Sequence, residues 1–223
     1  MLFSRTKNSE AVPIPQLDKM VPADLETATF ALGWFWGPDA QFGTVKGIYR
    51  TRAGYTGGKK KFPTYHSLGN HTEAMQVDFD PSQISFEEIM NMVWASHNPT
   101  RAAWSTQYMS SIWVESDEQL AIANKTAAEQ AEKNRWKIKT PILPLKTFYI
   151  AEDYHQKYSL QKYYSLMKKF RVMYPDFKDF NDSTVAARLN GFLSGHGDKV
   201  LYEAEVDGYG FTREELDNAA KRR

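Results

Sequence analysis

The hydrophobic pattern of the chain predicts several strands. Residues 27–32 form an apolar run typical of a buried strand, and residues 47–55 interleave β-forming side chains with arginine. Residues 71–79 alternate with a period of two, and apolar stretches at residues 106–114 and 147–151 predict further strands. In the alternating stretch one face carries Glu73, Met75, Val77 and Phe79, and the other carries Thr72, Ala74, Gln76 and Asp78.

Polar capping signals predict helices between these strands. Ser85 and Glu88 form a capping box, and the helix that they begin is expected to end near His97, before an Asn-Pro pair. Ser116 with Gln119 predicts an alanine-rich helix that reaches about residue 137. The inward face of the first helix is expected to carry Phe86, Ile89, Met90, Val93 and Trp94.

The two ends of the chain differ from its middle. Residues 1–24 are polar and contain three prolines, which predicts an arm over the domain surface or a disordered tail. Residues 152–170 are helical in composition, residues 183–190 predict a short helix ended by Gly191 before a turn at 192–197, and Thr212 with Glu215 caps a last helix that runs into residues 221–223. We expect one α+β domain at residues 25–165 and a helical C-terminal extension at residues 166–223, packed on the same domain.

An aromatic corner follows the first predicted strand, in the sequence Gly33-Trp34-Phe35-Trp36-Gly37-Pro38. Gly37 suits a helix N-cap and Pro38 the first helical position. Residues just before such a helix face unpaired N–H groups and the positive end of the helix dipole, which favours an anion or a reactive thiolate. The position best placed for a nucleophile is nevertheless Trp34, and the chain contains no cysteine.

Composition and charge exclude several function classes. The 28 basic and 27 acidic residues give a formal net charge of +1, so the whole chain offers no electrostatic case for nucleic acid or a membrane surface. Without cysteine there are no disulfides or thiolate metal sites, and the five histidines lack metal-ligand spacing. No phosphate loop, dinucleotide fingerprint or nucleophile elbow is present. The N-terminus lacks a long apolar run, so we expect no signal peptide or membrane span and a cytoplasmic location.

Glu73 is a candidate acid because its strand face is otherwise apolar. If that face forms the core, desolvation raises the pKa of the carboxyl and keeps part of it protonated near neutrality, as a proton donor requires. If the strand end is exposed instead, Glu73 is an ordinary solvated carboxylate. The spacing alone leaves both environments open and favours the exposed one.

Six short motifs occur in a fixed order over about residues 25–160. They are Gly-Trp-Phe-Trp-Gly at 33–37, Gly-Tyr-Thr-Gly-Gly at 54–58, Pro-Thr-Tyr at 63–65, His-Thr-Glu-Ala at 71–74, Thr-Gln-Tyr at 106–108 and Ala-Glu-Asp-Tyr-His-Gln at 151–156. Together they resemble the peptide methionine sulfoxide reductase A family, whose signature Gly-Cys-Phe-Trp-Gly has cysteine where this chain has Trp34. The resemblance implies a two-layer α+β sandwich around a mixed or antiparallel sheet with a ferredoxin-like core.

The resemblance also implies a reaction, the reduction of methionine S-sulfoxide, free or in proteins, as repair of oxidative damage. In the family a cysteine thiolate attacks the sulfoxide sulfur and becomes sulfenic acid, which external thiols or thioredoxin reduce, so no bound cofactor or metal is implied. On this resemblance Glu73 would be the acid that protonates the departing oxygen, which reverses the preference from spacing alone. Tyr65 and Tyr108 would hydrogen-bond that oxygen, and Phe35, Trp36 and His155 would lie at the substrate. We expect a monomer.

Three departures from the family pattern concern the chemistry. Trp34 occupies the nucleophile position, residues 101–105 lack the family's further acidic residue, and no resolving cysteine is present. Two interpretations of Trp34 follow. Either the protein is a reductase-fold pseudoenzyme that binds methionine sulfoxide or a protein partner, or position 34 is a selenocysteine whose UGA codon was rendered as tryptophan. A deliberate inactivating substitution is a third possibility, although serine or alanine is the usual choice.

Overall fold

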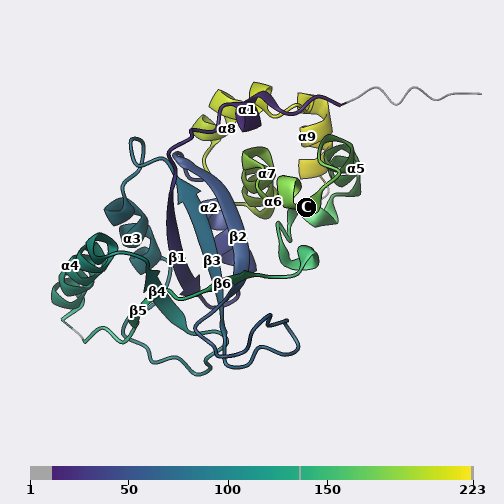
Figure 1. The fold of residues 1–223 in the computed structure, drawn as a ribbon. Coiled ribbons are helices and arrows are strands. Elements are labelled where there is room, and N and C mark those ends of the chain that lie inside the picture. Colours follow the sequence, from purple (N-terminus) through teal and green to yellow (C-terminus); the bar gives the residue numbers. More distant parts are fainter. Residues whose placement is uncertain (1–11, 136, 222–223) are drawn as a thin grey trace, which may run out of the picture.

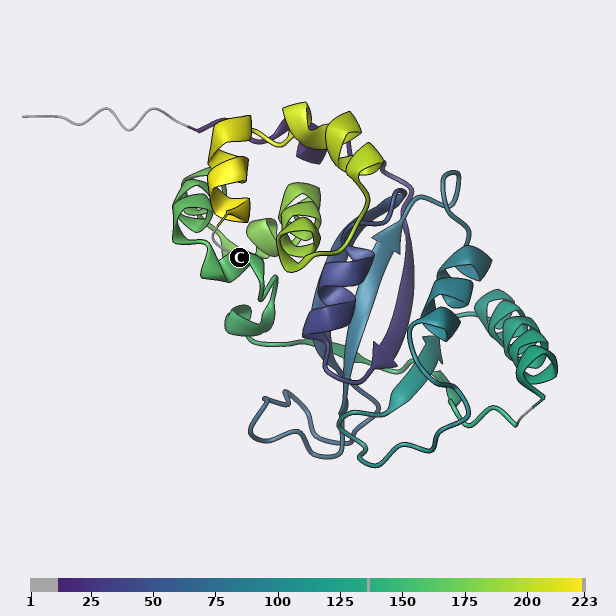
Figure 2. The same cartoon turned by 180° about the vertical axis from the view of Figure 1, so that it is seen from behind.

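The computed structural model describes residues 12–135 and 137–221. A six-stranded sheet stands at its centre, with helices gathered on both sides of it (Figures 1 and 2). The strands are β1 (Glu26–Leu32), β2 (Ile48–Thr56), β3 (Thr72–Phe79), β4 (Ser110–Val114), β5 (Ile142–Pro144) and β6 (Phe148–Ile150). The pattern at 106–114 therefore forms a strand only over its second half, and β5 carries no strand signal in the sequence.

The sheet contains the expected ferredoxin-like core. Its strand order is β5-β4-β1-β3-β2-β6, and the inner four strands run antiparallel in the order β4-β1-β3-β2. With α2 (Trp36–Phe42) between β1 and β2, and α3 (Phe86–Ala95) between β3 and β4, this is the split β-α-β arrangement. Parallel pairing of β5 with β4 makes the sheet mixed, as expected.

One hydrophobic cluster joins the sheet to α2, α3 and α4 (Asp117–Asn134). The expected capping box forms between Ser85 and Glu88, and α3 turns its predicted apolar face inward. Met75, Val77 and Phe79 of β3 lie in this cluster, so the predicted apolar face of that strand is the core face. The helix α4 is shorter than predicted because Arg135 adopts a left-handed conformation after Asn134.

The helix after the aromatic corner begins earlier than the sequence predicts. Phe35 is the N-cap of α2 and Trp36 its first residue, so Gly37 is not the cap and Pro38 is the third helical position. The amide of Asp39 donates the first helical hydrogen bond to the carbonyl of Phe35. Pro38 is tolerated there because amides of the first helical turn have no acceptor within the helix.

The part of the chain from residue 152 onward differs most from its prediction. Residues 152–170 do not form one helix but two short 3₁₀ turns, Asp153–His155 and Leu160–Lys162, followed by α5 (Tyr164–Met173). Gly191 lies inside α7 (Thr184–Ser194), and Gly195 ends that helix. The remaining helices are α6 (Phe177–Asn181), α8 (Lys199–Glu205) and α9 (Arg213–Ala220), the last with its predicted capping box.

The described part of the N-terminal segment is an arm laid across the extension. Figures 1 and 2 show its short helix α1 (Gln16–Lys19) beside the yellow C-terminal helices. Asp18 accepts hydrogen bonds from the hydroxyl of Ser183 at 2.7 Å and the amide of Val185 at 3.1 Å, and also from the Tyr174 hydroxyl. Residues 1–11 and 222–223 lie outside the described residues, including the predicted end of the last helix.

A buried polar network links the extension to α2. Lys157 and Asp39 are both fully buried, and the Lys157 ammonium lies 3.5 Å from the Asp39 carboxylate. Asn190 of α7 donates to the same carboxylate at 3.2 Å, and Asn181 of α6 accepts from Lys157 at 3.0 Å. The helix α2, which follows the aromatic corner, is therefore held in place by the contacts of Asp39 with Lys157 and with Asn190 of the extension.

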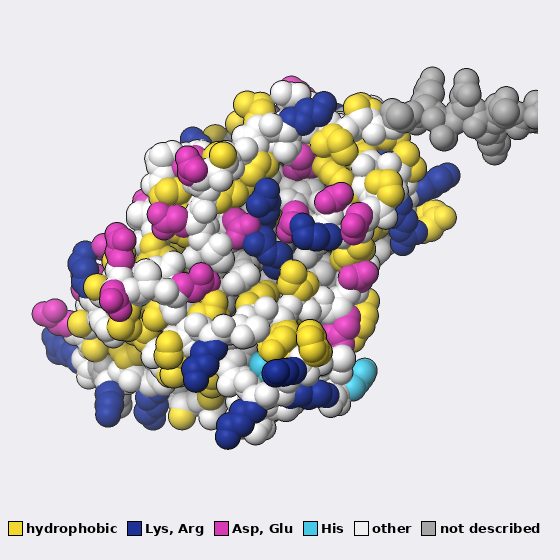
Figure 3. All heavy atoms as spheres, in the orientation of Figure 1, with side chains coloured by type: hydrophobic (Ala, Val, Ile, Leu, Met, Phe, Trp, Pro, Cys, Tyr) yellow, Lys and Arg dark blue, Asp and Glu magenta, His cyan; other side chains and the backbone are white. Residues whose placement is uncertain are grey.

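No helix in the described part of the chain is long and apolar enough to cross a membrane. On the face shown in Figure 3, acidic and basic side chains are interspersed over most of the surface. This distribution agrees with the near-zero net charge of the sequence.

Candidate functional site

The aromatic corner places residue 34 at the mouth of a small cavity. Gly33 follows β1 with φ of +85°, a left-handed conformation that glycine adopts without strain and that turns the chain toward α2. Trp34 comes next, its side chain 66% exposed and its indole packed edge-on to Tyr108 with ring centroids 6.1 Å apart. A side chain at position 34 can therefore reach both solvent and the cavity.

The cavity encloses about 150 Å³ and is lined by Trp34, Phe35, Trp36, Tyr65 and Glu73. Three of these side chains come from the corner, one from the loop between β2 and β3, and one from β3. The lining is thus aromatic apart from the carboxyl of Glu73, and Tyr65 adds a hydroxyl group. Such a space suits a small apolar group that carries one polar atom.

Glu73 is buried, with 2% of its surface exposed, so the exposed alternative is wrong. Burial raises the pKa of its carboxyl, and hydrogen bonds from the Gln107 side chain and the Phe35 amide oppose that rise. Those donors lie 2.9 Å from Oε1 and 3.4 Å from Oε2. The net effect is a raised pKa, so Glu73 holds its proton more readily than an ordinary glutamate does, as a proton donor requires.

Two tyrosine hydroxyls lie beside this acid. The hydroxyls of Tyr65 and Tyr108 are 3.3 Å apart, and Gln107 donates to the Tyr108 oxygen at 3.0 Å. The hydrogen bond to Tyr108, with burial as a second cause, raises the pKa of Tyr65 to about 12. Tyr65 therefore keeps its proton at neutral pH and can donate a hydrogen bond to a bound oxygen.

Trp36 of the aromatic corner is hydrogen-bonded to His155. The indole N–H of Trp36 donates to Nδ1 of His155 at 3.2 Å, which leaves the ring proton of a neutral His155 on Nε2. Burial lowers the pKa of His155 and favours that neutral form. His155 contacts the rings of Phe35 and Tyr65 but does not line the cavity, so it positions aromatic side chains that do.

The pKa of a second carboxyl close by, that of Glu152, is shifted in the opposite direction. Burial by itself would raise the pKa of Glu152, but hydrogen bonds, including those from the Tyr65 amide and the Tyr55 hydroxyl, outweigh it and lower the pKa. These donors lie 2.9 Å and 2.8 Å from the carboxylate. Glu152 is thus an ionised anchor for the Tyr65 backbone, whereas Glu73 is the protonatable group.

The structure brings together most of the residues predicted from the sequence and adds others. Gln107, Glu152 and Tyr55 organise the site but are not among the predicted site residues, although all three lie within motifs already singled out. Tyr158 also was missed, and its ring stacks on Trp36 at a centroid distance of 3.9 Å. A long-range partner such as Tyr158 leaves no local pattern in the sequence.

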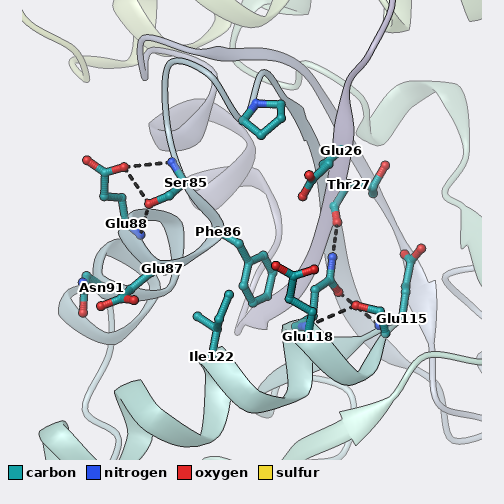
Figure 4. Close-up of a pocket in the computed structure, with 13 residues that line it drawn as sticks. Glu26, Thr27, Ser85, Phe86, Glu87, Glu88, Asn91, Glu115, Glu118 and Ile122 are labelled. Carbon is teal, nitrogen blue, oxygen red and sulfur yellow. Dashed lines mark hydrogen bonds between the residues drawn. The ribbon is translucent and has the colours of Figure 1, made fainter.

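A larger hollow, of about 730 Å³, lies away from this site between the beginnings of α3 and α4 (Figure 4). Two of its glutamates have partners of their own: Figure 4 shows Glu88 turned back to Ser85 as a helix cap, and Glu87 pairs with Lys125. Within residues 12–135 and 137–221, no group of three or more His, Cys, Asp or Glu side chains could hold a metal ion.

Comparison with protein families gives two matches. Residues 26–189 match the family described as peptide methionine sulfoxide reductase. Residues 177–217 match the helical domain described for selenoprotein methionine sulfoxide reductase A. The first match contains the whole aromatic corner and its partners, and the second lies in the C-terminal extension.

Individual proteins agree with these matches. The chain is 37% identical over 188 residues to a peptide methionine sulfoxide reductase of Drosophila melanogaster, covering 83% of this chain and 75% of that protein. It is 38% identical to one of Synechocystis, covering 67% and 77%. Among solved structures, reduced Mxr1 of Saccharomyces cerevisiae matches with a TM-score of 0.58 at 30% identity, covering 63% of this chain and 87% of that one. Methionine sulfoxide reductase A of Corynebacterium diphtheriae matches with a TM-score of 0.56 at 29% identity, covering 68% and 84%.

Proposed function

The chain belongs to the peptide methionine sulfoxide reductase A family, and from this premise we propose that its natural gene product reduces methionine S-sulfoxide, free or in proteins, to methionine. We propose that position 34 of that product is selenocysteine, encoded by UGA, and that the chain with Trp34 does not turn over. An indole offers neither a thiolate nor a selenolate. The match of residues 177–217 to a helical domain of selenoprotein members supports this assignment.

The observation that carries the proposal is the buried, protonatable Glu73 at the cavity wall beside position 34. In the proposed reaction a selenolate at position 34 attacks the sulfoxide sulfur while Glu73 donates its proton to the oxygen. This attack forms a selenium–sulfur bond. The hydroxyl then passes from sulfur to selenium as the sulfur–oxygen and selenium–sulfur bonds break, which releases methionine as the thioether and leaves a selenenic acid at position 34. Two thiols then restore the selenol with release of water and a disulfide, a role for thioredoxin or a small thiol.

The remaining side chains have positioning roles in this proposal. Tyr65 and Tyr108 hold the sulfoxide oxygen near Glu73 through their hydroxyls, and Phe35 and Trp36 contact the S-methyl group. A chain without cysteine has no resolving residue, which fits a selenenic acid that external thiols reduce directly. Oxidative-damage repair is the physiological role that such chemistry supports.

Two measurements test the proposal. A UGG codon at position 34 in the gene would overturn the selenocysteine assignment. Trp34→Cys should restore reduction of methionine S-sulfoxide with dithiothreitol, and Trp34→Ser should not, because serine cannot undergo the redox cycle. An inactive but folded Trp34→Cys protein would show that the site does not support the chemistry.

The retained cavity also favours a second candidate function. If codon 34 is UGG, we propose a pseudoenzyme that binds methionine sulfoxide or an oxidised protein partner, because the exposed Trp34 forms one wall of a cavity that remains about 150 Å³ in volume. Calorimetric titration of the present chain with a methionine S-sulfoxide peptide, and with its reduced form as control, tests this function. Equal or absent binding of both would exclude it.

We propose that the protein works as a cytoplasmic monomer. Light scattering on purified protein should give the mass of one chain, and fractionation of the source cells should recover it with cytoplasmic markers. A mass of two chains would contradict the monomer.

A further inference from the structure

Two open grooves continue from the sulfoxide cavity along the C-terminal extension. The near groove, of about 500 Å³, shares Trp34 and Trp36 with the cavity and is also lined by Tyr158, Lys162 and His196. The far groove, of about 700 Å³, shares His196 with the near one. Because neighbouring hollows share lining side chains, the three lie one after another from the reacting position to α8.

Both grooves lie where the C-terminal extension meets the rest of the chain. The near groove is lined by Leu32, Ala40, Tyr158 and Lys162 of the α+β domain and by Ser194 and His196 of the extension. The far groove places core residues Val45 and Met92 opposite Val200, Leu201 and Ala204 of α8. The path therefore joins two parts of the chain that are far apart in sequence.

A tight turn fixes the junction at His196. Gly195 and Gly197 flank it with φ of +99° and +79°, both in the left-handed region. A Cβ at position 197 would lie 2.5 Å from the Phe192 ring and 2.8 Å from Cβ of Thr44, so the turn is packed directly against the end of α2. Close packing therefore fixes the backbone turn at the junction of the two grooves.

The far groove has the character of a binding surface for an apolar side chain. Val200 is 80% exposed although it faces other apolar residues across the groove. The acidic groups at its margin are already engaged: Asp198 caps α8 by accepting from the Leu201 amide at 2.7 Å, and Glu205 pairs with Arg188 at 2.7 Å. An apolar occupant would remove exposed carbon surface from water without burying either of these carboxylates unpaired, and the exposed Lys46 at the margin can keep its ammonium in water.

We propose that this path receives the polypeptide on one side of an oxidised methionine, with an apolar side chain of the substrate in the far groove. The inference rests on the proposed function, because the sulfoxide cavity fixes the starting point of the path. A methionine sulfoxide within a protein carries backbone on both sides, and the near groove offers His196, Lys162 and Ser194 as polar partners for that backbone. The extension thereby selects sulfoxides by their sequence neighbours.

Trp34 is relevant to this selection. It lines both the cavity and the near groove, so a smaller residue such as cysteine or selenocysteine at position 34 would widen the connection between them. The test is therefore best made with the full-length Trp34→Cys protein. Dithiothreitol serves as reductant, which keeps the electron donor the same for every substrate.

The substrates are serine-rich peptides with one central methionine S-sulfoxide and a single leucine moved through the positions on either side. The parent peptide has no leucine, and N-acetyl methionine S-sulfoxide amide is the reference. We expect kcat/KM to rise about tenfold over the parent when leucine occupies one register on one side, the effect typical of an apolar group in a hydrophobic pocket.

Val200→Asp and Ala204→Asp should each bring that leucine-to-parent ratio to about one. Val172→Asp is the matched control, since Val172 is also an exposed valine on a helix of the extension but lines neither groove, and it should keep the ratio. A ratio near one at every leucine position, or an equal loss in Val172→Asp, overturns the groove assignment while activity on the reference substrate upholds the proposed function. No turnover of any substrate, including the reference, overturns the proposed function and this inference with it.

Discussion

The side-chain amide of Gln107 donates a hydrogen bond of 2.9 Å to Oε1 of Glu73. The same amide reaches the Tyr108 hydroxyl at 3.0 Å, so one residue sets both the ionisation of the acid and the position of a phenol. Because this hydrogen bond favours the ionised carboxylate, it limits how far burial raises the pKa of Glu73. Gln107 therefore tunes the proton donor.

Replacing Gln107 with methionine should move the pH dependence of reduction. In a Trp34→Cys background, Gln107→Met removes a hydrogen bond that lowers the pKa of Glu73, so the alkaline limb of kcat/KM should shift to higher pH. The rate at the optimum should fall about tenfold, since Tyr108 loses its donor as well. Gln76→Met is the control, because Gln76 lies on the opposite face of β3 and bonds Thr29. All variants carry the same thiol at position 34, so its titration is common to them. If the alkaline limb of kcat/KM does not move in the Gln107→Met variant, the role of Gln107 is contradicted.

Glu73→Gln should separate activity from stability. The pKa of Glu73 is raised in the folded state, so its contribution to stability is present below the unfolded pKa and is lost as the pH rises through the folded pKa. The uncharged glutamine escapes that loss. We expect a stability gain over the glutamate protein that grows with pH in this window, together with a rate loss of about a hundredfold or more in the Trp34→Cys background. Thermal unfolding across pH measures the first effect, and a gain independent of pH would contradict it.

Glu152→Gln should show the opposite pH dependence. Its pKa is lowered in the folded state despite burial, so the carboxylate contributes stability above its unfolded pKa and that contribution disappears as the pH falls through the folded pKa. The variant should therefore be less stable than the parent near neutrality and converge with it in acid. Parallel thermal unfolding of the Glu73→Gln and Glu152→Gln proteins gives the comparison. If the stability difference from the parent has the same sign in both variants near neutrality, the two carboxyls do not differ as described.

The sequence predicts the face of Glu73 but not its environment. A period of two is a local property, so the alternation at residues 71–79 identifies the core face of β3 correctly. The burial of Glu73 depends on a distant segment: its amide bonds the Gln107 carbonyl at 2.8 Å, and its carboxyl bonds the Gln107 side chain. Only the family motifs connect those two segments in advance.

The wrong helix predictions from residue 152 onward also arise from long-range contacts that the local sequence does not show. Residues 152–170 are composed like a helix, but the Gln156 side chain bonds both backbone groups of Ala53, and Lys157 adopts a φ of +48° where it meets Asp39. The sequence predicts a helix end at Gly191, yet this residue lies inside α7, where a Cβ would be 2.3 Å from the Ala40 carbonyl oxygen. That glycine permits close packing of α7 on α2, and composition alone does not distinguish this role from a stop signal.

Removing the charge of Lys157 should destabilise the protein because it leaves Asp39 as a buried anion. Both side chains are fully buried, and burial lowers the pKa of Lys157 while the Asp39 carboxylate opposes that effect. We expect Lys157→Met to cost about 3–5 kcal/mol of unfolding free energy, the cost typical of breaking a buried pair from one side. Asp39→Asn combined with Lys157→Met should recover a large part of that loss, since no uncompensated charge then remains. Urea unfolding of the two single variants and the double variant measures the coupling. If the loss in the double variant equals the sum of the two single losses, Lys157 and Asp39 are not coupled energetically.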